Sequence, residues 1–166
     1  SALWYFECNE NDEIVHVNWS HAFRHILGYH NILDFPNKLD SWSNLLHPED
    51  YDRVMHLLLE TIADKSNATK FSVEYRLKMQ DGQYQWFRAS AEVIRRLDGS
   101  ANRIAGIISN IDAEKRSRMQ AQRAAAFHRA FTSANLCEYY VNLEKNTFDT
   151  FKVEPSLMTA FEQNHT

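Results

Sequence analysis

Hydrophobic and polar residues alternate near the start of the chain, as they do in a strand with one buried face. The segment LWYFECN, residues 3–9, places Trp4, Phe6 and Cys8 on one side. A polar turn, NENDE, separates it from the segment IVHVN, residues 14–18. This second segment is short and rich in β-branched residues, so the chain is predicted to open with two strands.

Helical signals follow these strands. Ser20 is a residue type that caps helices and Gly28 one that ends them, so SHAFRHILG predicts a short helix. A helical turn is expected around Trp42. From Pro48 to about Ala63 apolar residues recur every three or four positions, which predicts an amphipathic helix. Its expected buried face consists of Val54, Leu57, Leu58 and Ile62.

The hydrophobic period changes to two after the long helix. KFSVEYRLKM alternates apolar and polar residues, and QYQWFRASAEVIRR and NRIAGIISNI follow it. Asp-Gly turns at Asp81-Gly82 and Asp98-Gly99 separate the three segments, as in an antiparallel meander. The order of two strands, several helices and three strands predicts an α+β fold. We expect a five-stranded antiparallel sheet with helices on one face, followed by a connector helix.

The segment DAEKRSRMQAQRAAAFHRAFTSA has no Gly or Pro and predicts a long helix. Residues 112–129 hold five basic and two acidic side chains, so most of this helix should face solvent. Met119, Ala126 and Ala130 form only a thin apolar stripe, too weak for a strong coiled coil. We therefore interpret this segment as a helix that connects two domains.

The chain after Leu136 resembles its own beginning. LCEYYVNLEKNTFDTFKVEPSLMTAF repeats the order aromatic strand, polar turn, second strand and capped helix that starts at Leu3. Such self-similarity indicates the beginning of a second copy of the same domain. The predicted organisation is a domain at residues 1–111, a connector helix at 112–134 and a truncated second domain at 135–166.

Composition and charge exclude several classes of protein. The net charge of -4 and the isoelectric point near 6.0 give no general attraction to nucleic acid or to an anionic membrane. The two cysteines, Cys8 and Cys137, suit neither a disulfide framework nor a zinc site, so a reducing compartment is expected. No apolar run reaches the roughly 18 residues of a membrane span. The strand-like start indicates a piece of a longer protein, with any membrane anchor outside it.

The stretch SWSNLLHPEDYDRVM, residues 41–55, raises the question of a catalytic cluster, because it gathers His47, Glu49 and Asp50. Each residue also suits the start of a helix. Proline is favoured at the first helical position, and carboxylates in the first turn oppose the helix dipole. No second His or Cys lies nearby to complete a metal site. We therefore interpret the stretch as the beginning of the long helix.

Other candidate chemistry is weak. His21 and His25 are spaced as metal ligands on one helix face, but no glutamate of the zincin pattern accompanies them. There is no G-x-S-x-G motif and no phosphate-binding glycine loop. The outward charges of the meander, Glu74, Arg76, Arg88 and Glu92, are predicted to form cross-strand pairs. We predict no catalytic residue, no metal ligand and no enzymatic activity in this chain.

These features together resemble the PAS domain family, in the subgroup with a PAC-type C-terminal half. The resemblance rests on WSHAFRHILGY, LLHPED, VEYRLKMQDGQYQWFRA, the Asp98-Gly99 turn and RIAGIISNID leading to Lys115. The motifs occur in the family's order over residues 3–115. The resemblance implies a sensory or dimerisation module within a larger signalling protein, and the segment after Leu136 looks like another PAS beginning.

One departure from the family pattern concerns signal coupling. PAS domains usually close the last strand with an Asp-Ile-Thr triplet, whose acid and hydroxyl tie the core to the exit helix. The corresponding residues here are Asn110, Ile111 and Asp112. Asp112 can still cap the exit helix, whereas Asn110 cannot form the ionic contact. Asn110, Asp112 and Lys115 are the coupling residues that the resemblance implies.

A ligand pocket is a second expectation from the resemblance. It would lie between the long helix and the meander and be lined by Val54, Leu58, Tyr75, Phe87, Ala89, Gly106 and Ile108. Small side chains there would leave space for a ligand, while a filled core is the alternative. No cofactor is predicted, because the reactive-cysteine motif of the flavin-binding relatives is absent. A haem-binding relative would need a histidine facing the pocket, and His56 lies beside the apolar stripe.

The function expected from the resemblance is regulatory. The chain would be the sensory PAS module of a histidine kinase, diguanylate cyclase or chemoreceptor, relaying its state through the C-terminal helix. The alternatives are a ligand-free dimerisation module and a haem or metal sensor. The expected partners are a second copy of the chain and the output domain of the same polypeptide, without nucleic acid or direct membrane contact. The expected location is the cytoplasm, or the cytoplasmic part of a membrane-anchored sensor.

Overall fold

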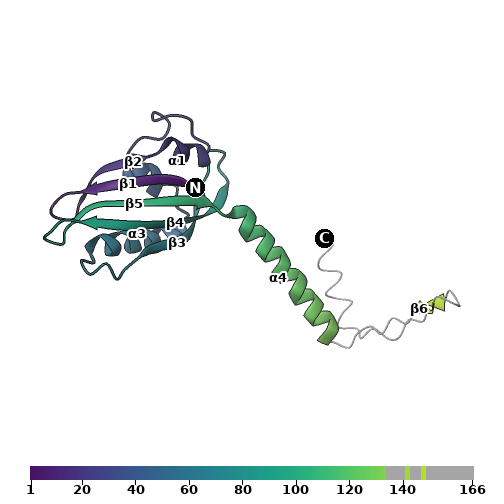
Figure 1. Cartoon of the computed structure of the whole chain (residues 1–166). Coiled ribbons are helices and arrows are strands. Elements are labelled where there is room, and N and C mark those ends of the chain that lie inside the picture. The colour runs from purple at the N-terminus through teal and green to yellow at the C-terminus, as the bar shows by residue number, and fades with distance from the viewer. Residues whose placement is uncertain (134–140, 143–146, 149–166) are drawn as a thin grey trace. The chain divides into compact units, whose positions relative to one another are not determined.

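Five strands form one antiparallel sheet in the order β2-β1-β5-β4-β3 (Figure 1). The computed structural model describes residues 1–133, 141–142 and 147–148. The elements in chain order are β1 (Ala2–Cys8), β2 (Ile14–Trp19), α1 (His21–Ile26), α2 (Leu39–Ser43), α3 (Pro48–Ala63), β3 (Phe71–Lys78), β4 (Tyr84–Arg95), β5 (Ala101–Asn110), α4 (Asp112–Ser133), β6 (Val141–Asn142) and β7 (Thr147–Phe148). Apart from the paired strands β6 and β7, the predicted second domain at residues 135–166 lies outside the described residues.

The predicted meander is confirmed, because β3, β4 and β5 are neighbours in the sheet. The first strand of the chain lies inside the sheet. In β1, Trp4 pairs with Trp19 of β2 on one side and with Gly106 of β5 on the other. Residues Ser1–Lys115 form one compact unit around this sheet.

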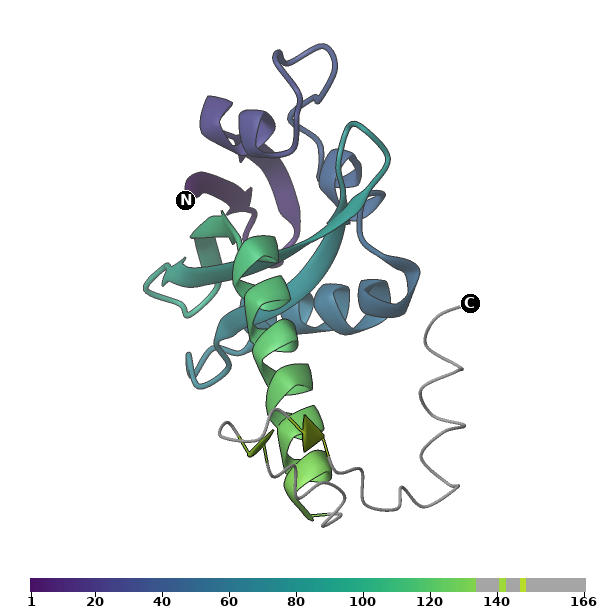
Figure 2. The same cartoon turned by 90° about the vertical axis from the view of Figure 1, so that its right-hand side faces the viewer.

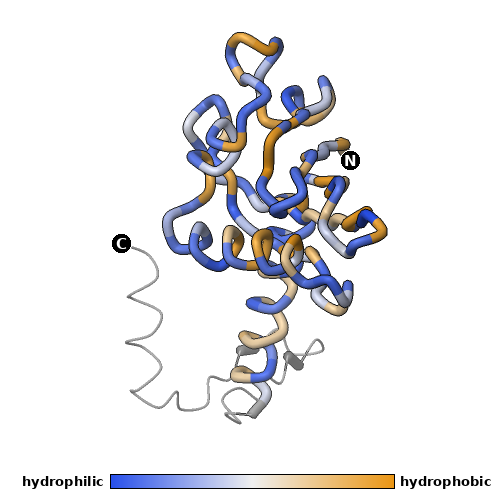
Figure 3. The backbone as a smooth tube through the Cα atoms, turned by 90° about the vertical axis from the view of Figure 1, so that its left-hand side faces the viewer, coloured by the Kyte–Doolittle hydropathy of each residue, from blue (hydrophilic) through white to orange (hydrophobic). Residues whose placement is uncertain are grey.

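Helices α1, α2 and α3 cover one face of the sheet (Figure 2), and the residues on that face are buried. β1 and β3 show the expected alternation, with every second side chain buried. On α3, Val54, Leu58 and Ile62 are buried as predicted, whereas Leu57 is only half-buried. Hydrophobic (orange) and hydrophilic (blue) stretches both occur along the strands and helices of this unit (Figure 3). The expected α+β sheet with helices on one face is therefore confirmed.

Aromatic side chains fill much of this core. The buried ones are Trp4, Phe6, Trp19, Phe23, Phe35, Trp42, Phe71, Tyr75 and Phe87. Trp4 needs a glycine opposite it: a Cβ atom on Gly106 would lie 2.7 Å from Cζ2 of Trp4 and 2.3 Å from the carbonyl oxygen of Ser90. Real Cβ contacts are not that short, so the small residue at position 106 accommodates an indole.

A buried cation that the sequence did not predict anchors the loop after α1. Arg24 is buried, and its Nε donates to the carbonyl oxygen of Phe35 at 2.9 Å. Its Nη1 donates to the carbonyl of Trp19, and its Nη2 to Oδ1 of Asn37, at 2.5 and 2.6 Å. Burial lowers the pKa of this guanidinium, and neutral oxygens satisfy it without a carboxylate. Ser20 caps α1 as predicted, since its Oγ accepts from the N–H of Phe23.

Helix α4 differs from the other helices in exposure. From residue 116 to residue 132 every side chain is exposed, including the predicted apolar stripe of Met119, Ala126 and Ala130. Phe127 and Phe131 stack on each other along the helix, with ring centroids 6.2 Å apart. None of the helices in the described residues has the length and apolarity that crossing a membrane requires.

Candidate signal-coupling site

The stretch His47-Pro48-Glu49-Asp50 begins α3. His47 is the N-cap residue, and its Nδ1 accepts a hydrogen bond from the backbone N–H of Glu49 at 3.2 Å. Pro48 occupies the first helical position, and both carboxylates lie in the first turn. The interpretation of this stretch as a helix start is confirmed.

Asp50 does more than oppose the helix dipole, because its carboxylate is buried and bound to Arg76 of β3. Oδ2 accepts from the backbone N–H of Arg76 at 3.0 Å and from its Nε at 2.9 Å. Arg53, one turn along α3, donates to Oδ1 at 3.2 Å. Burial acts to raise the pKa of Asp50, but the hydrogen bonds from both arginines outweigh it and lower that pKa to about 2. Asp50 is therefore ionised and holds the start of α3 on the sheet.

These contacts also cover the outer edge of β3. The N–H of His47 donates to the carbonyl of Arg76 at 3.0 Å, and the N–H of Lys78 donates to the carbonyl of Leu45 at 2.8 Å. Arg53 donates to the carbonyl of Glu74 at 2.9 Å. An edge strand with unpaired backbone groups invites pairing with another chain. The segment that starts α3 removes this possibility over Glu74–Lys78.

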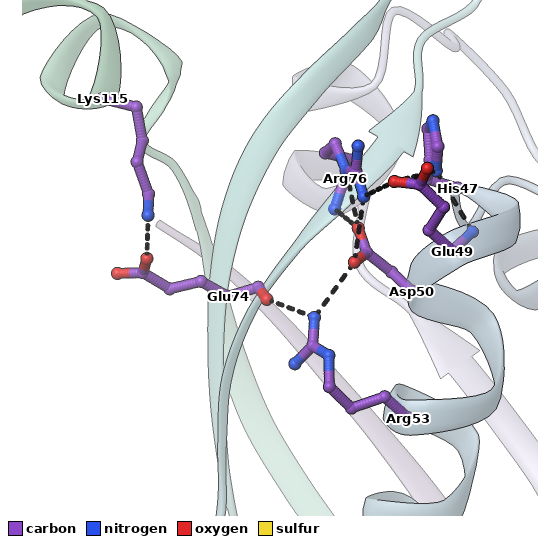
Figure 4. A network of polar contacts seen from close by, with 7 residues as sticks. All are labelled: His47, Glu49, Asp50, Arg53, Glu74, Arg76 and Lys115. Carbon is purple, nitrogen blue, oxygen red and sulfur yellow. Dashed lines mark hydrogen bonds and ion pairs between the residues drawn. The ribbon is translucent and has the colours of Figure 1, made fainter. Parts of the chain in front are cut away.

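On the outer face of the sheet, Glu74 connects β3 to the first turn of α4 (Figure 4). One carboxylate oxygen accepts from Nη2 of Arg88 at 2.8 Å, and the other lies 2.5 Å from Nζ of Lys115. Hydrogen bonds from Lys115 and Arg88 lower the pKa of Glu74. Arg88 also reaches Glu114, with Nη2 and Oε1 3.2 Å apart. The cross-strand pair of Glu74 with Arg88 was expected, while the contacts with α4 were not.

We call Asp50, Arg53, Glu74, Arg76 and Lys115 the polar relay. Its members lie on α3, β3 and α4, and Figure 4 shows the contacts between them in one view. Arg76 was predicted to pair across strands. That prediction is wrong, because its guanidinium bonds to Asp50 and, at 2.9 Å, to Glu49 of α3. The separation of 26 residues between Asp50 and Arg76 left no local signal of this contact.

Trp86 of β4 joins the two ends of the relay. Two cations lie over its ring: Cζ of Arg76 is 5.2 Å from the ring centroid, and Nζ of Lys115 is 4.7 Å from it. Its backbone N–H donates to Oδ1 of Asp112 at 3.3 Å, and its carbonyl accepts from the N–H of Ile111 at 2.9 Å. Cations over an indole face are attracted by the ring quadrupole. Trp86 therefore contacts the relay and the junction of β5 with α4.

The predicted coupling residues Asn110, Asp112 and Lys115 all lie at this junction. Oδ1 of Asn110 accepts from the N–H of Asp112 at 2.9 Å, and its Nδ2 donates to Oε1 of Gln85 at 2.6 Å. Asp112, which was expected to cap α4, is itself the first residue of this helix. Asn110 thus makes two neutral hydrogen bonds at this junction, one with the backbone of Asp112 and one with the side chain of Gln85 on β4.

The predicted pocket residues all lie together in the core. Val54, Leu58, Tyr75, Phe87, Ala89, Gly106 and Ile108 are buried. The hydroxyl of Tyr75 accepts from Nε1 of Trp42 at 3.3 Å, and burial raises the pKa of this tyrosine. Gly106 has Trp4 against it, as described above. Trp4 and Trp42, which the sequence did not mark as pocket residues, therefore occupy the space beside the expected lining.

His21, His25, His30 and His56 are exposed at the surface. The rings of His21 and His25 are 6.3 Å apart, as are those of His25 and His30. Within the part of the chain that the structure describes, no group of three or more His, Cys, Asp or Glu side chains is placed to hold a metal ion. The side chain of His56 is 82% exposed and lies 3.7 Å from Glu60, so its ring does not face the core.

Comparison with known proteins identifies the family. A family model described as the PAS fold matches residues 16–108. The chain belongs to the PAS fold family. The matched residues run from β2 to β5, and so include the start of α3 and all of β3 and β4.

Two curated relatives resemble this PAS domain in sequence. The sensor protein FixL of Bradyrhizobium diazoefficiens is 31% identical over 99 residues, which are 60% of this chain and 19% of FixL. The uncharacterised protein y4lL of Sinorhizobium fredii is 32% identical over 71 residues, 43% of this chain and 8% of that protein. The chain thus corresponds to a small part of each relative.

Solved structures share the fold at low sequence identity. A sensory box histidine kinase/response regulator from Burkholderia thailandensis matches with a TM-score of 0.61 and 21% identity, over 78% of this chain and 90% of that one. The N-terminal domain of a diguanylate cyclase with a PAS/PAC sensor from Marinobacter aquaeolei matches with a TM-score of 0.56 and 20% identity, over 69% and 99%. Both confirm the PAS architecture.

Proposed function

We propose that this chain is the sensory module of a larger signal-transduction protein and that its PAS domain acts on an output domain through α4. Residues 1–111 would be the sensory domain, residues 112–134 the signalling helix and residues 135–166 the beginning of a second PAS domain. The similarity to the sensor protein FixL supports a sensory role. The likeness to a histidine kinase/response regulator and to a diguanylate cyclase with a PAS/PAC sensor supports a histidine kinase or cyclase as the parent. The module itself would be non-catalytic and cytoplasmic.

The observation that carries this proposal is the polar relay. Charged contacts run from the first turns of α3, across the edge and outer face of β3, to the first turn of α4. A shift of α3 or β3 changes where Glu74 and Trp86 hold Lys115. Signal transmission requires an element with two arrangements whose equilibrium the input biases. The first turn of α4 is that element in our proposal.

A matched pair of substitutions tests the relay. Glu74 and Glu92 both lie on the outer face of the sheet, and each binds a lysine, Lys115 at 2.5 Å and Lys70 at 3.1 Å. Only Glu74 reaches α4. Glu74→Gln is expected to increase hydrogen–deuterium exchange at residues 111–118 by about three-fold, the effect of losing one partly exposed ion pair. Glu92→Gln should leave that exchange unchanged.

Mass spectrometry of the deuterated peptides is the measurement. The same two substitutions in the longer parent protein should change output activity for Glu74 and leave it unchanged for Glu92. Equal exchange at residues 111–118 in both variants would exclude the relay as the route to α4.

A ligand-free form of this module is supported by a separate observation, the packing of Trp4 against Gly106. The core holds its own aromatic side chains where the expected pocket lining begins, so we propose no cofactor.

The module would act as a homodimer that responds to a neighbouring domain. Native mass spectrometry reveals any small molecule retained on purification, and sedimentation equilibrium at several concentrations measures the dimer. A small molecule that stays bound through purification would favour the ligand sensor instead.

A further inference from the structure

The N-cap of α3 depends on the protonation state of a histidine. Nδ1 of His47 accepts the N–H of Glu49, and a nitrogen can accept only when it carries no proton. The capped structure therefore contains neutral His47 with its proton on Nε2. The side chain is 23% exposed, so water reaches the ring. Histidine is the side chain that ordinarily changes charge between pH 5 and 8.

Charged and titratable groups surround this ring from three elements. On α3, Oε2 of Glu49 lies 3.9 Å from Nδ1. From β3, Nη2 of Arg76 binds the same Oε2 at 2.9 Å. From β4, the ring of Tyr84 packs edge-on at 4.7 Å. Glu49 is thus already shared between an arginine and a histidine that can become a second cation.

We propose that His47 is a proton-binding site that switches the start of α3. When Nδ1 takes up a proton it can no longer accept from the N–H of Glu49, and it becomes a donor toward the Glu49 carboxylate. The positive charge also stands at the N-terminal end of a helix, where the dipole disfavours cations. Protonation removes the cap and draws Glu49 from Arg76 toward His47.

The consequence for the rest of the domain runs through Arg76. Its guanidinium is divided among Glu49, Asp50 and the ring of Trp86. Asp50 stays ionised and bound, so Arg76 is not released but shifts toward Asp50 when Glu49 withdraws. The ring of Trp86 contacts both Arg76 and Lys115, so a movement of Arg76 changes the surroundings of this ring. This last step rests on the proposed function, because it uses the relay to reach α4.

The test is a pH titration of the whole 166-residue chain by proton–nitrogen NMR, from pH 8 to pH 5. The backbone resonance of Glu49 and the ring resonances of His47 are expected to move with one common midpoint. Exchange protection of the first-turn amides of α3 should fall about five-fold at the acid end, the effect of losing an N-cap. The indole N–H of Trp86 should move with the same midpoint.

Two variants serve as controls. His47→Asn keeps a capping acceptor but cannot titrate in this range, so the Glu49 resonance should become independent of pH. His56→Gln removes an exposed histidine of the same helix that has a carboxylate neighbour but no backbone N–H to accept, and the titration should persist. A Glu49 resonance that does not move in the wild type, or that still moves in His47→Asn, overturns the proposal. Movement of Glu49 without movement of Trp86 upholds the switch and overturns its connection to the relay.

Discussion

The two ends of the polar relay use the same kind of ion pair in different surroundings. At one end the side chain of Asp50 is 8% exposed and accepts from both the backbone and the guanidinium of Arg76. At the other end Glu74 is 30% exposed and Lys115 24%. A buried carboxylate that loses its partner is left unpaired away from water, whereas a partly exposed one is solvated again. The ion pair of Asp50 with Arg76 is therefore expected to stay formed and act as an anchor. The ion pair of Glu74 with Lys115 is expected to break at a small cost in free energy.

The largest effect should come from removing the anchor. Asp50→Ala leaves Arg76 without its buried partner and frees the N–H at the edge of β3. The free energy of unfolding is expected to fall by about 3 kcal/mol, the usual cost of breaking a buried pair. Urea denaturation followed by circular dichroism measures it. Asp52→Ala, an exposed carboxylate on the same helix, should change stability by less than about 0.5 kcal/mol. Equal losses of stability in Asp50→Ala and Asp52→Ala would show that Asp50 is not an anchor.

Acid should weaken the anchor in a defined window. The pKa of Asp50 is lowered from 3.8 to about 2 in the folded protein, so its contribution to stability is complete above about pH 4. That contribution declines as the pH falls toward 2, because the unfolded chain then binds a proton more readily than the folded one. The stability difference between the wild type and Asp50→Asn should therefore narrow by about 2 kcal/mol between pH 4 and pH 2. Urea denaturation at several pH values checks this, and a constant difference would contradict it.

The smallest effect is expected at the Glu74 end. A double-mutant cycle of Glu74→Gln and Lys115→Met should give an interaction energy below about 1 kcal/mol, as for other partly exposed pairs. Thermal unfolding measures the stability of the four proteins. An interaction energy as large as that of the Asp50 end would mean that both ends are anchors, and α4 would then lack a readily opened contact.

Much of the fold could be predicted because its signals are local. The alternation in KFSVEYRLKM marks a strand whether or not its neighbours are known, and Pro48 with two carboxylates marks a helix start. The predicted range from Pro48 to Ala63 is the range that α3 occupies. The three predicted coupling residues, Asn110, Asp112 and Lys115, also lie together, because only two or three positions separate one from the next.

The rest of the site could not be predicted from local signals. Glu49 and Asp50 are equivalent in sequence as first-turn carboxylates, yet Asp50 is buried and Glu49 is exposed. Their difference arises from which side of α3 meets the edge of β3. Gly106 suggested empty space beside the core, but the pairing of β1 with β5 brings Trp4 against it.

For residues 1–111 the sequence by itself determined the type and order of the helices and strands and the helix-start role of His47, since these depend on backbone preferences and on residues a few positions apart. Only the tertiary structure decided that β1 enters the middle of the sheet, that Asp50 binds Arg76 and that Glu74 reaches Lys115. Those contacts join residues from 26 to more than 100 positions apart. Their energies depend on burial, and burial is set only once the sheet and its helices have assembled.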